Sequence, residues 1–275
     1  MRKDWNNISN ALFEIKKELV KNDPGIKCVE PIPASGSDLF ADDLKLLHEF
    51  AVSNPMYVDS YEQRLGSVRC MVYTGNVDRY WLGSISHDSS YAPFSPTWIT
   101  SAYVLGMLAK ELGYSEAVDI GSGDGRIAFC SGIAGMRSHA IEIDPGLANL
   151  QRSIGKTNFV SHCSDATEFD YSILNLVHPI FFIGGLAQMG GNMLASRVIK
   201  KVRQIPGLWR NSGWVFAGTH APKYAPDPKG YGGWGTLMQE NNLEPARTVI
   251  LPTAWTLGEP QDTPYVFAAP NRNPH

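Results

Sequence analysis

The chain has 275 residues, of which 43% are hydrophobic and 19% charged, so it can build a large core and is not a wholly disordered chain. Its 24 lysines and arginines against 27 acids give a formal net charge of -3, which excludes a strongly basic nucleic-acid-binding domain. The four cysteines, at positions 28, 70, 130 and 163, lack C-x-x-C spacing. We therefore predict no metal site and a reducing, cytoplasmic compartment.

No membrane segment is predicted. The N-terminal residues 1–20 are charged and helix-periodic, and they lack the apolar core of a signal peptide. The most apolar stretch, residues 180–194, is interrupted by four glycines and is too short to span a bilayer.

Residues 1–88 form a first unit with a different pattern from the rest. Apolar residues at helical spacing predict an amphipathic helix that ends near residues 22–25, and a second helix is predicted over 39–51. Two strand-like segments, 67–74 and 79–85, predict a hairpin. Two interpretations remain open for this α+β extension: a structural cap, or a lid that recognises substrate.

Residues 89–275 form the second unit, in which strands and helices alternate. The predicted helices are 99–112, 124–133, 145–154 and 194–205, and the predicted strands are 117–120, 138–143, 159–163, 179–183, 213–218, 247–253 and 265–269. Such alternation predicts a mostly parallel sheet with helices on both faces. The last two strands have no helix between them, which predicts an antiparallel pair at one edge.

A glycine-rich turn follows the first of these strands, in Asp119-Ile-Gly-Ser-Gly-Asp-Gly-Arg126. Glycines permit positive φ and close approach of a ligand, and the carboxyl end of such a strand is where open α/β sheets bind ligands. The spacing is G-x-G-x-G, and Arg126 stands where a dinucleotide fingerprint needs glycine. Carboxylates at Asp119 and Asp124 match a cationic guest better than a pyrophosphate.

Two more acids follow the next two strands. Glu142 closes the second strand, where a carboxylate can accept hydrogen bonds from the hydroxyls of a ribose. Asp165 follows the third strand and can accept a hydrogen bond from an adenine amine. Asp144 and Pro145 are typical of a helix start.

These residues together resemble the class I S-adenosylmethionine-dependent methyltransferase family, over about residues 91–269. Asp119-x-Gly121-x-Gly123-x-Gly125 resembles the family's first motif, which holds the methionine portion of the cofactor. Glu142 and the pair Asp165-Ala166 match the positions used for ribose and adenine. The resemblance implies a Rossmann-like sheet of seven strands with an antiparallel last strand near the edge. It also likens residues 91–97 to a segment that folds over the cofactor in small protein-lysine methyltransferases.

The site that we predict binds S-adenosyl-L-methionine. Its cofactor-binding residues are Asp119, Gly121, Ser122, Gly123, Asp124, Gly125, Glu142, Ile143, Asp165, Ala166 and Gly184. Gly184 and Gly185 are either an ordinary turn or a place where substrate approaches the methyl group. No catalytic residue is assigned, and Tyr91 and His220 are the candidates.

The predicted activity is methyl transfer, with a protein lysine as the first acceptor, a small molecule as the second and RNA as the third. The segment after the fourth strand, Phe182-Ile-Gly-Gly-Leu186, lacks the Pro-Pro motif of enzymes that methylate nucleic-acid amines. Two alternatives remain: a catalytically silent cofactor-binding module, and a nicotinamide-dependent dehydrogenase that Arg126 disfavours.

Overall fold

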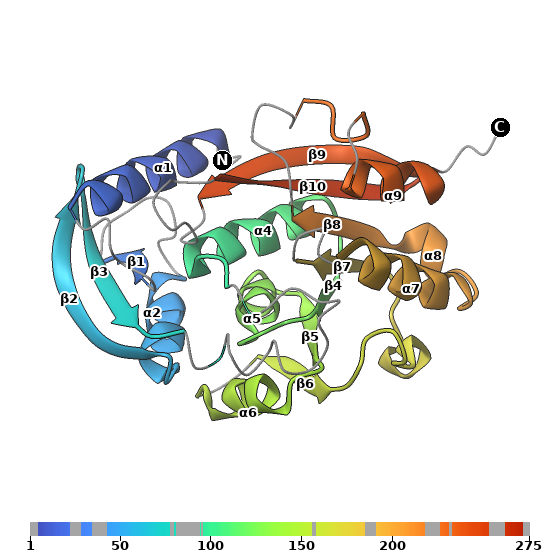
Figure 1. Cartoon of the computed structure of the whole chain (residues 1–275), viewed down its shortest axis with the longest axis horizontal. Helices are drawn as coiled ribbons and strands as arrows, with labels where there is room; N and C mark the ends of the chain where they lie inside the picture. The colour runs from blue at the N-terminus through green and yellow to red at the C-terminus, as the bar shows by residue number, and fades with distance from the viewer. Residues whose placement is uncertain are drawn as a thin grey trace.

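A computed structural model describes residues 5–22, 29–34, 43–77, 80, 94, 96–155, 158–184, 191–217, 226–230, 233–252 and 262–271. The chain in these ranges forms two sheets, a small one from the N-terminal residues and a seven-stranded one from the rest (Figure 1). None of the helices in these ranges is long and apolar enough to cross a membrane.

The described ranges of the N-terminal unit include the helices α1 (Trp5–Asn22) and α2 (Leu44–Ser53) and the strands β1 (Val29–Pro33), β2 (Tyr57–Leu65) and β3 (Val68–Gly75). The sheet order is β1-β3-β2, with both neighbours of β3 antiparallel to it. The helix predicted over 39–51 is α2, and its residues 39–42 lie outside the described ranges.

The predicted hairpin has a different partner strand. The segment 67–74 is the strand β3, but it forms its hairpin with β2, which precedes it in the chain, and its other edge pairs with β1. Both edges of β3 are therefore occupied by strands other than the predicted partner 79–85. The turn is Gly66-Ser67, with Gly66 at a φ of +60° that suits glycine. The segment 79–85 lies outside the described residues except for Tyr80, which is helical.

The larger unit alternates strands and helices as predicted. Its elements are α4 (Ile99–Glu111), β4 (Glu116–Ile120), α5 (Arg126–Ile133), β5 (Arg137–Glu142), α6 (Pro145–Ser153), β6 (Phe159–Cys163), the short 3-10 helix η1 (Tyr171–Leu174), β7 (Pro179–Ile183), α7 (Gly191–Arg203), α8 (Leu208–Asn211), β8 (Gly213–Ala217), α9 (Trp234–Glu240), β9 (Leu243–Pro252) and β10 (Asp262–Pro270).

The strand order of the large sheet is β6-β5-β4-β7-β8-β10-β9. The first five are parallel, and β10 is inserted between β8 and β9, antiparallel to both. The predicted fold class is therefore confirmed, including the antiparallel pair. The order reverses direction between β4 and β7, which marks the place where open α/β sheets bind ligands.

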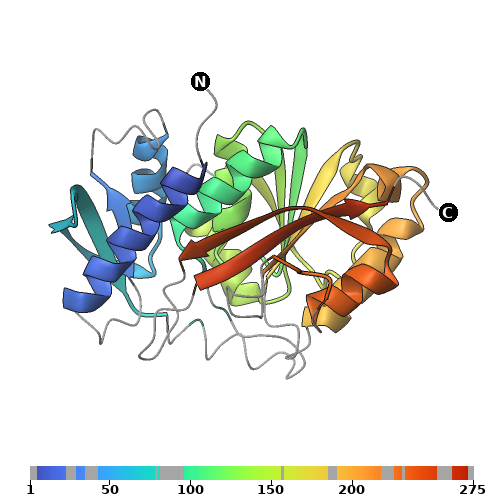
Figure 2. The same cartoon turned by 90° about the horizontal axis from the view of Figure 1, so that it is seen from above.

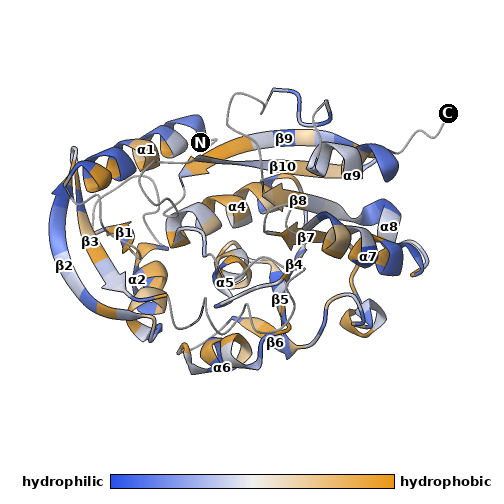
Figure 3. Ribbon diagram, in the orientation of Figure 1, coloured by the Kyte–Doolittle hydropathy of each residue, from blue (hydrophilic) through white to orange (hydrophobic). Residues whose placement is uncertain are grey.

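Helices cover both faces because side chains alternate across each strand. On β7, Phe182 belongs to the core cluster that contains residues of α4, α5 and α6, whereas Phe181 belongs to the cluster with residues of α7, α8 and α9. Ten residues of α4 are buried, and the hydropathy colouring shows the contrast between this helix and the polar edge strand β2 (Figure 3).

The N-terminal unit shares its core with the large sheet. Leu12 of α1 and Phe50 of α2 belong to the same buried cluster as Phe129 of α5 and Leu251 of β9. The ring centroids of Phe50 and Phe129 are 4.7 Å apart. In the view from above, α1 lies beside the ends of β9 and β10 (Figure 2).

Candidate cofactor site

The glycine loop connects β4 to α5 and is tied to the neighbouring strand. The backbone N–H groups of Gly121 and Ser122 donate to the carbonyl of Ile141, at 2.9 and 3.1 Å. Gly121, Gly123 and Gly125 all have positive φ, between +57° and +81°. Gly125 is the N-cap residue of α5. The sequence places glycine where the backbone of this loop is left-handed.

Two of these glycines differ in what surrounds them. A Cβ added to Gly121 would meet no atom of the described residues within 4 Å, so its Cα borders space that these residues leave open. A Cβ on Gly123 would lie 2.3 Å from the ring of Phe94, which packs directly on the loop. Phe94 belongs to the segment 91–97 that was predicted to fold over the cofactor, and residues 91–93 and 95 lie outside the described ranges.

Asp119 lies on β4, two residues before Gly121, and carries an unsatisfied oxygen. It is 3% exposed, and its Oδ2 has no hydrogen-bond partner among the residues that the structure describes. Burial raises the pKa of this carboxyl to about 8, a hydrogen bond from the Ala128 backbone opposes the rise, and the negative charges of Glu142 and Asp124 add to it. A buried acceptor without a partner is uncommon in folded proteins and is costly. A cationic ligand would satisfy it.

Glu142 joins the second strand to the glycine loop. Its Oε2 accepts from the Gly123 N–H at 2.7 Å, and its Oε1 accepts from the Asp144 N–H at 2.9 Å. Burial raises the pKa of this carboxyl, and the hydrogen bonds from the two backbone N–H groups oppose the rise. A carboxylate has about four acceptor positions, so Glu142 retains capacity for a hydroxyl group.

The other predicted residues lie at the same edge of the sheet. Asp165 accepts from the N–H and hydroxyl of Thr167 through Oδ1, and the neighbouring Ser164 N–H donates to the carbonyl of Glu142 at 2.9 Å. Ala166 is buried and Ile143 is half-buried. Gly184 is exposed and follows Ile183, the register partner of Ile120. The ends of β4, β5, β6 and β7 thus bring the predicted residues to one edge.

Asp124, one of the predicted cofactor-binding residues, has its side chain in contact with the N-terminal unit. Its carboxylate is fully buried and forms an ion pair with Arg126, with Nη2 to Oδ2 at 2.5 Å. The amide of Asn54 also donates to Oδ2, at 2.9 Å. Its side chain is therefore engaged by the N-terminal unit, and its role toward a cofactor stays a prediction. Tyr91 and His220 lie outside the described residues.

Sequence reasoning missed Gln151, a fully buried residue of α6. Its Nε2 donates to Ser122 Oγ and to the Gly123 carbonyl, both at 2.8 Å, and its Oε1 accepts from Ser161. The helix spacing could have indicated that Gln151 is buried, because it follows Leu147 by four residues and lies on the same buried face of α6. A polar amide on that face predicts a buried hydrogen-bonded role.

Asp144 and Pro145 start α6 as predicted. The Asp144 side chain accepts from the Gly146 and Leu147 N–H groups at 2.6 and 3.0 Å, and Pro145 follows it as the first helical residue. Among the described residues no cluster of three or more histidine, cysteine or acidic side chains could hold a metal ion.

A scan against protein-family models gives no match, and neither does a search of curated proteins. Solved structures similar to this chain include an S-adenosylmethionine-dependent methyltransferase of Anabaena variabilis, at 11% identity and a TM-score of 0.47, with 70% of this chain and 93% of that chain covered. A second is magnesium protoporphyrin IX methyltransferase of Synechocystis with bound S-adenosylhomocysteine, at 12% identity and a TM-score of 0.40, with 71% and 99% covered.

A third is a candidate RNA methyltransferase of Pyrococcus horikoshii, at 13% identity and a TM-score of 0.46, with 64% and 85% covered. At such identities and TM-scores, function does not transfer from one protein to another. We therefore infer the function of this chain from the geometry of its own site.

Proposed function

We propose that this chain is an S-adenosylmethionine-dependent methyltransferase whose cofactor site lies at the carboxyl ends of β4, β5 and β6. The observation that carries the proposal is the buried oxygen of Asp119, unsatisfied among the described residues, directly before a left-handed glycine loop that borders open space at Gly121. A buried carboxylate in that position suits a cationic amine and repels a pyrophosphate.

The residues present fit this cofactor. Asp119 would face the methionine end, where the cationic amine would lower the pKa of the carboxyl and ionise it. The backbone at Gly121 would allow close approach, Glu142 would accept from the ribose, and Asp165 would accept from the adenine amine. When bound, S-adenosylmethionine supplies a methyl group made electrophilic by its sulfonium. The protein then has mainly to orient an acceptor and exclude water, and orientation can lower a barrier by about 7–11 kcal/mol.

The acceptor that we propose is a protein lysine. The mild excess of acidic residues, with a formal net charge of -3, is compatible with a basic protein segment and less so with RNA. The resemblance of residues 91–97 to the lead-in segment of protein-lysine methyltransferases adds support. We place the enzyme in the cytoplasm, because the described cysteines, at 70, 130 and 163, are all free thiols.

Methyl-labelled S-adenosylmethionine tests the activity and the acceptor together. The chain is incubated with an extract of its source cells, which is then separated into protein, RNA and small molecules. We expect label in protein, recovered as methyl-lysine after acid hydrolysis. Label in RNA or in small molecules would refute the lysine assignment. Cofactor binding with no label in any fraction would indicate a catalytically silent module.

A further inference from the structure

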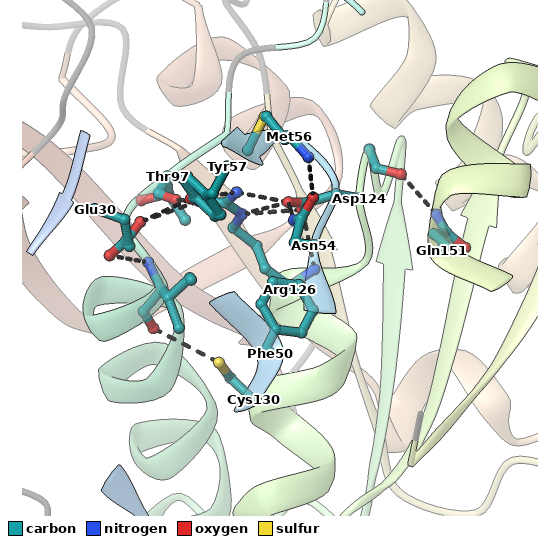
Figure 4. Close-up of polar contacts among 12 residues, drawn as sticks. Glu30, Phe50, Asn54, Met56, Tyr57, Thr97, Asp124, Arg126, Cys130 and Gln151 are labelled. Atoms are coloured by element: carbon teal, nitrogen blue, oxygen red, sulfur yellow. Dashed lines mark hydrogen bonds and ion pairs between the residues drawn. The ribbon is translucent and has the colours of Figure 1, made fainter. Parts of the chain in front are cut away.

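The N-terminal unit reaches the glycine loop through a buried polar cluster. We call it the Arg126 cluster, and it consists of Glu30, Asn54, Tyr57, Asp124 and Arg126 (Figure 4). Glu30, Asn54 and Asp124 are 0% exposed and Arg126 is 3% exposed. Three of the five residues come from the N-terminal unit, and Asp124 stands inside the glycine loop.

Arg126 holds the cluster together. Its Nη1 forms an ion pair with Glu30 of β1 at 3.3 Å and donates to the Thr97 carbonyl. Its Nη2 donates to the Tyr57 hydroxyl at 3.2 Å, and both Nη2 and Nε donate to Asp124. A guanidinium with a fixed fork of donors suits such a buried arrangement. The residue that replaces a third glycine thus connects two units of the chain.

Asn54 makes the direct contact from the N-terminal unit to the loop. Its Oδ1 accepts from the Met56 N–H at 3.1 Å, which fixes the orientation of the amide. Its Nδ2 is thereby directed to Asp124 Oδ2, at 2.9 Å. Asp124 stands between Gly123 and Gly125, two residues with left-handed backbone, so holding its side chain also restrains the loop on both sides.

Glu30 links the same cluster to the start of α4. Its Oε1 accepts from the Ile99 N–H at 2.9 Å, and its Oε2 faces Arg126. Burial raises the pKa of Glu30 to about 8, with Arg126 opposing the rise and Asp124 adding to it. Arg126 lies between the carboxylates of Glu30 and Asp124, and its positive charge offsets part of the cost of burying them.

We propose that Asn54 and the Arg126 cluster are positioning residues for the cofactor, so that the N-terminal unit sets the shape of the glycine loop. This inference rests on the proposed function. It assigns Glu30, Asn54 and Tyr57 to the cofactor-binding machinery, which neither a detached cap nor a substrate lid would require. Losing one contact of the cluster then lowers cofactor affinity although no cluster residue of the N-terminal unit needs to touch the cofactor.

The test uses the full chain and measures the dissociation constant of S-adenosylhomocysteine by calorimetry. Asn54→Asp keeps the size and the acceptor of Asn54 but turns a carboxylate toward Asp124. We expect affinity to fall by about tenfold or more, the scale of a lost hydrogen bond to a charged group.

Two further variants keep the test decisive if Asn54→Asp does not fold. Asn54→Ala removes the contact without adding a charge, and Tyr57→Phe removes only the hydroxyl at Arg126. Val72→Ala, a core change in β3 outside the cluster, is the control for a general loss of stability. All measurements are made at temperatures where each variant is folded.

Weaker binding by Tyr57→Phe and by each Asn54 variant that folds, together with unchanged binding by Val72→Ala, supports the proposal. Unchanged affinity in the Asn54 variants, or an equal loss in Val72→Ala, overturns it. A wild-type chain that does not bind S-adenosylhomocysteine at all refutes the proposed function instead, so the two failures are distinguishable.

Discussion

Glu142 shows how one carboxylate can serve both the loop and a ligand. The position of Glu142 after a strand predicted a ribose acceptor, but the hydrogen bonds from Gly123 and Asp144 could not be predicted, because they depend on the conformation of two turns. The glycine loop itself was predictable from its residue types. The engagement of Asp124 by Asn54 was not, because 70 residues separate them in the chain.

Glu142→Ala is expected to weaken binding of S-adenosylmethionine by about 1–3 kcal/mol, the cost of losing a charged hydrogen-bond acceptor. Glu142→Gln should rescue little of this, because its amide NH₂ would have to face a backbone N–H. Calorimetric titration of the two variants checks the prediction. Full affinity in either variant would contradict the ribose assignment.

Gly121→Ala is the sharpest test of where the ligand lies. The added Cβ meets no atom of the described residues and would point into the space proposed for the ligand, while the left-handed backbone costs an alanine about 1–2 kcal/mol of stability. We expect cofactor affinity to fall by at least about tenfold. Gly123 is a poorer site for this test, because a side chain there collides with Phe94.

Gly207→Ala provides the matched control for Gly121→Ala. Gly207 has a φ of +78° and open space around its Cα, at the start of α8. Its substitution should give a similar loss of stability and leave cofactor affinity unchanged. Equal effects of the two variants on affinity would show that Gly121 does not border the cofactor.

Asp119 predicts a pH dependence of stability. Its pKa rises from about 3.9 in the unfolded chain to about 8 in the folded one, so the folded state binds the extra proton between these values. The free energy of unfolding therefore falls as pH rises toward 8. Glu30, whose pKa burial also raises to about 8, changes the free energy of unfolding in the same direction. Burial lowers the pKa of His139 to about 4, so His139 makes the free energy of unfolding rise with pH, but only below about pH 6.5.

Urea denaturation at pH 6.5 and 8.0 checks this dependence in the ligand-free chain. The wild type should be less stable at pH 8.0, and Asp119→Asn should reduce the difference because its amide does not titrate in this range. A wild type that gains stability between the two pH values, or an unchanged difference in the variant, would be inconsistent with a protonated Asp119.

Among the helices and strands, the central strands of the large sheet could be predicted from the sequence, whereas the strands of the N-terminal unit were harder to predict. The segment 179–183 is an apolar run with turn residues on both sides, and β7 has the same bounds. By contrast, β1 is buried throughout, but Pro31 and Pro33 are atypical of a strand interior. The edge strand β2 buries only Leu65, so its sequence lacks the alternation that predicts a strand. The helix α9 was also missed.

Gln151 links α6 to the glycine loop, and its substitution tests that link. Gln151→Glu keeps the shape but sets a carboxylate oxygen against the Gly123 carbonyl. We expect a loss of about 1–3 kcal/mol in unfolding free energy, the cost of leaving buried polar groups unsatisfied. Gln204→Glu, at an exposed position, is the control and should stay near the wild type. Equal stability of the two variants would refute the role of Gln151.

For the whole molecule, the shared core predicts a single unfolding transition despite two sheets. Leu12 and Phe50 of the N-terminal unit pack in the same cluster as Phe129 and Leu251, and the Arg126 cluster joins the units at a second place. Units with a large common core unfold together. Far-ultraviolet circular dichroism and tryptophan fluorescence should give coincident urea transitions. Two separated transitions would show that the units fold independently.

The account as a whole depends on what the glycine loop binds. Calorimetric titration of the full chain with S-adenosylhomocysteine, and separately with NAD, measures this directly. We predict saturable binding of S-adenosylhomocysteine at a single site, abolished or strongly weakened in Gly121→Ala, and no heat with NAD. Binding of NAD alone, or no heat with either compound, would contradict the central claim.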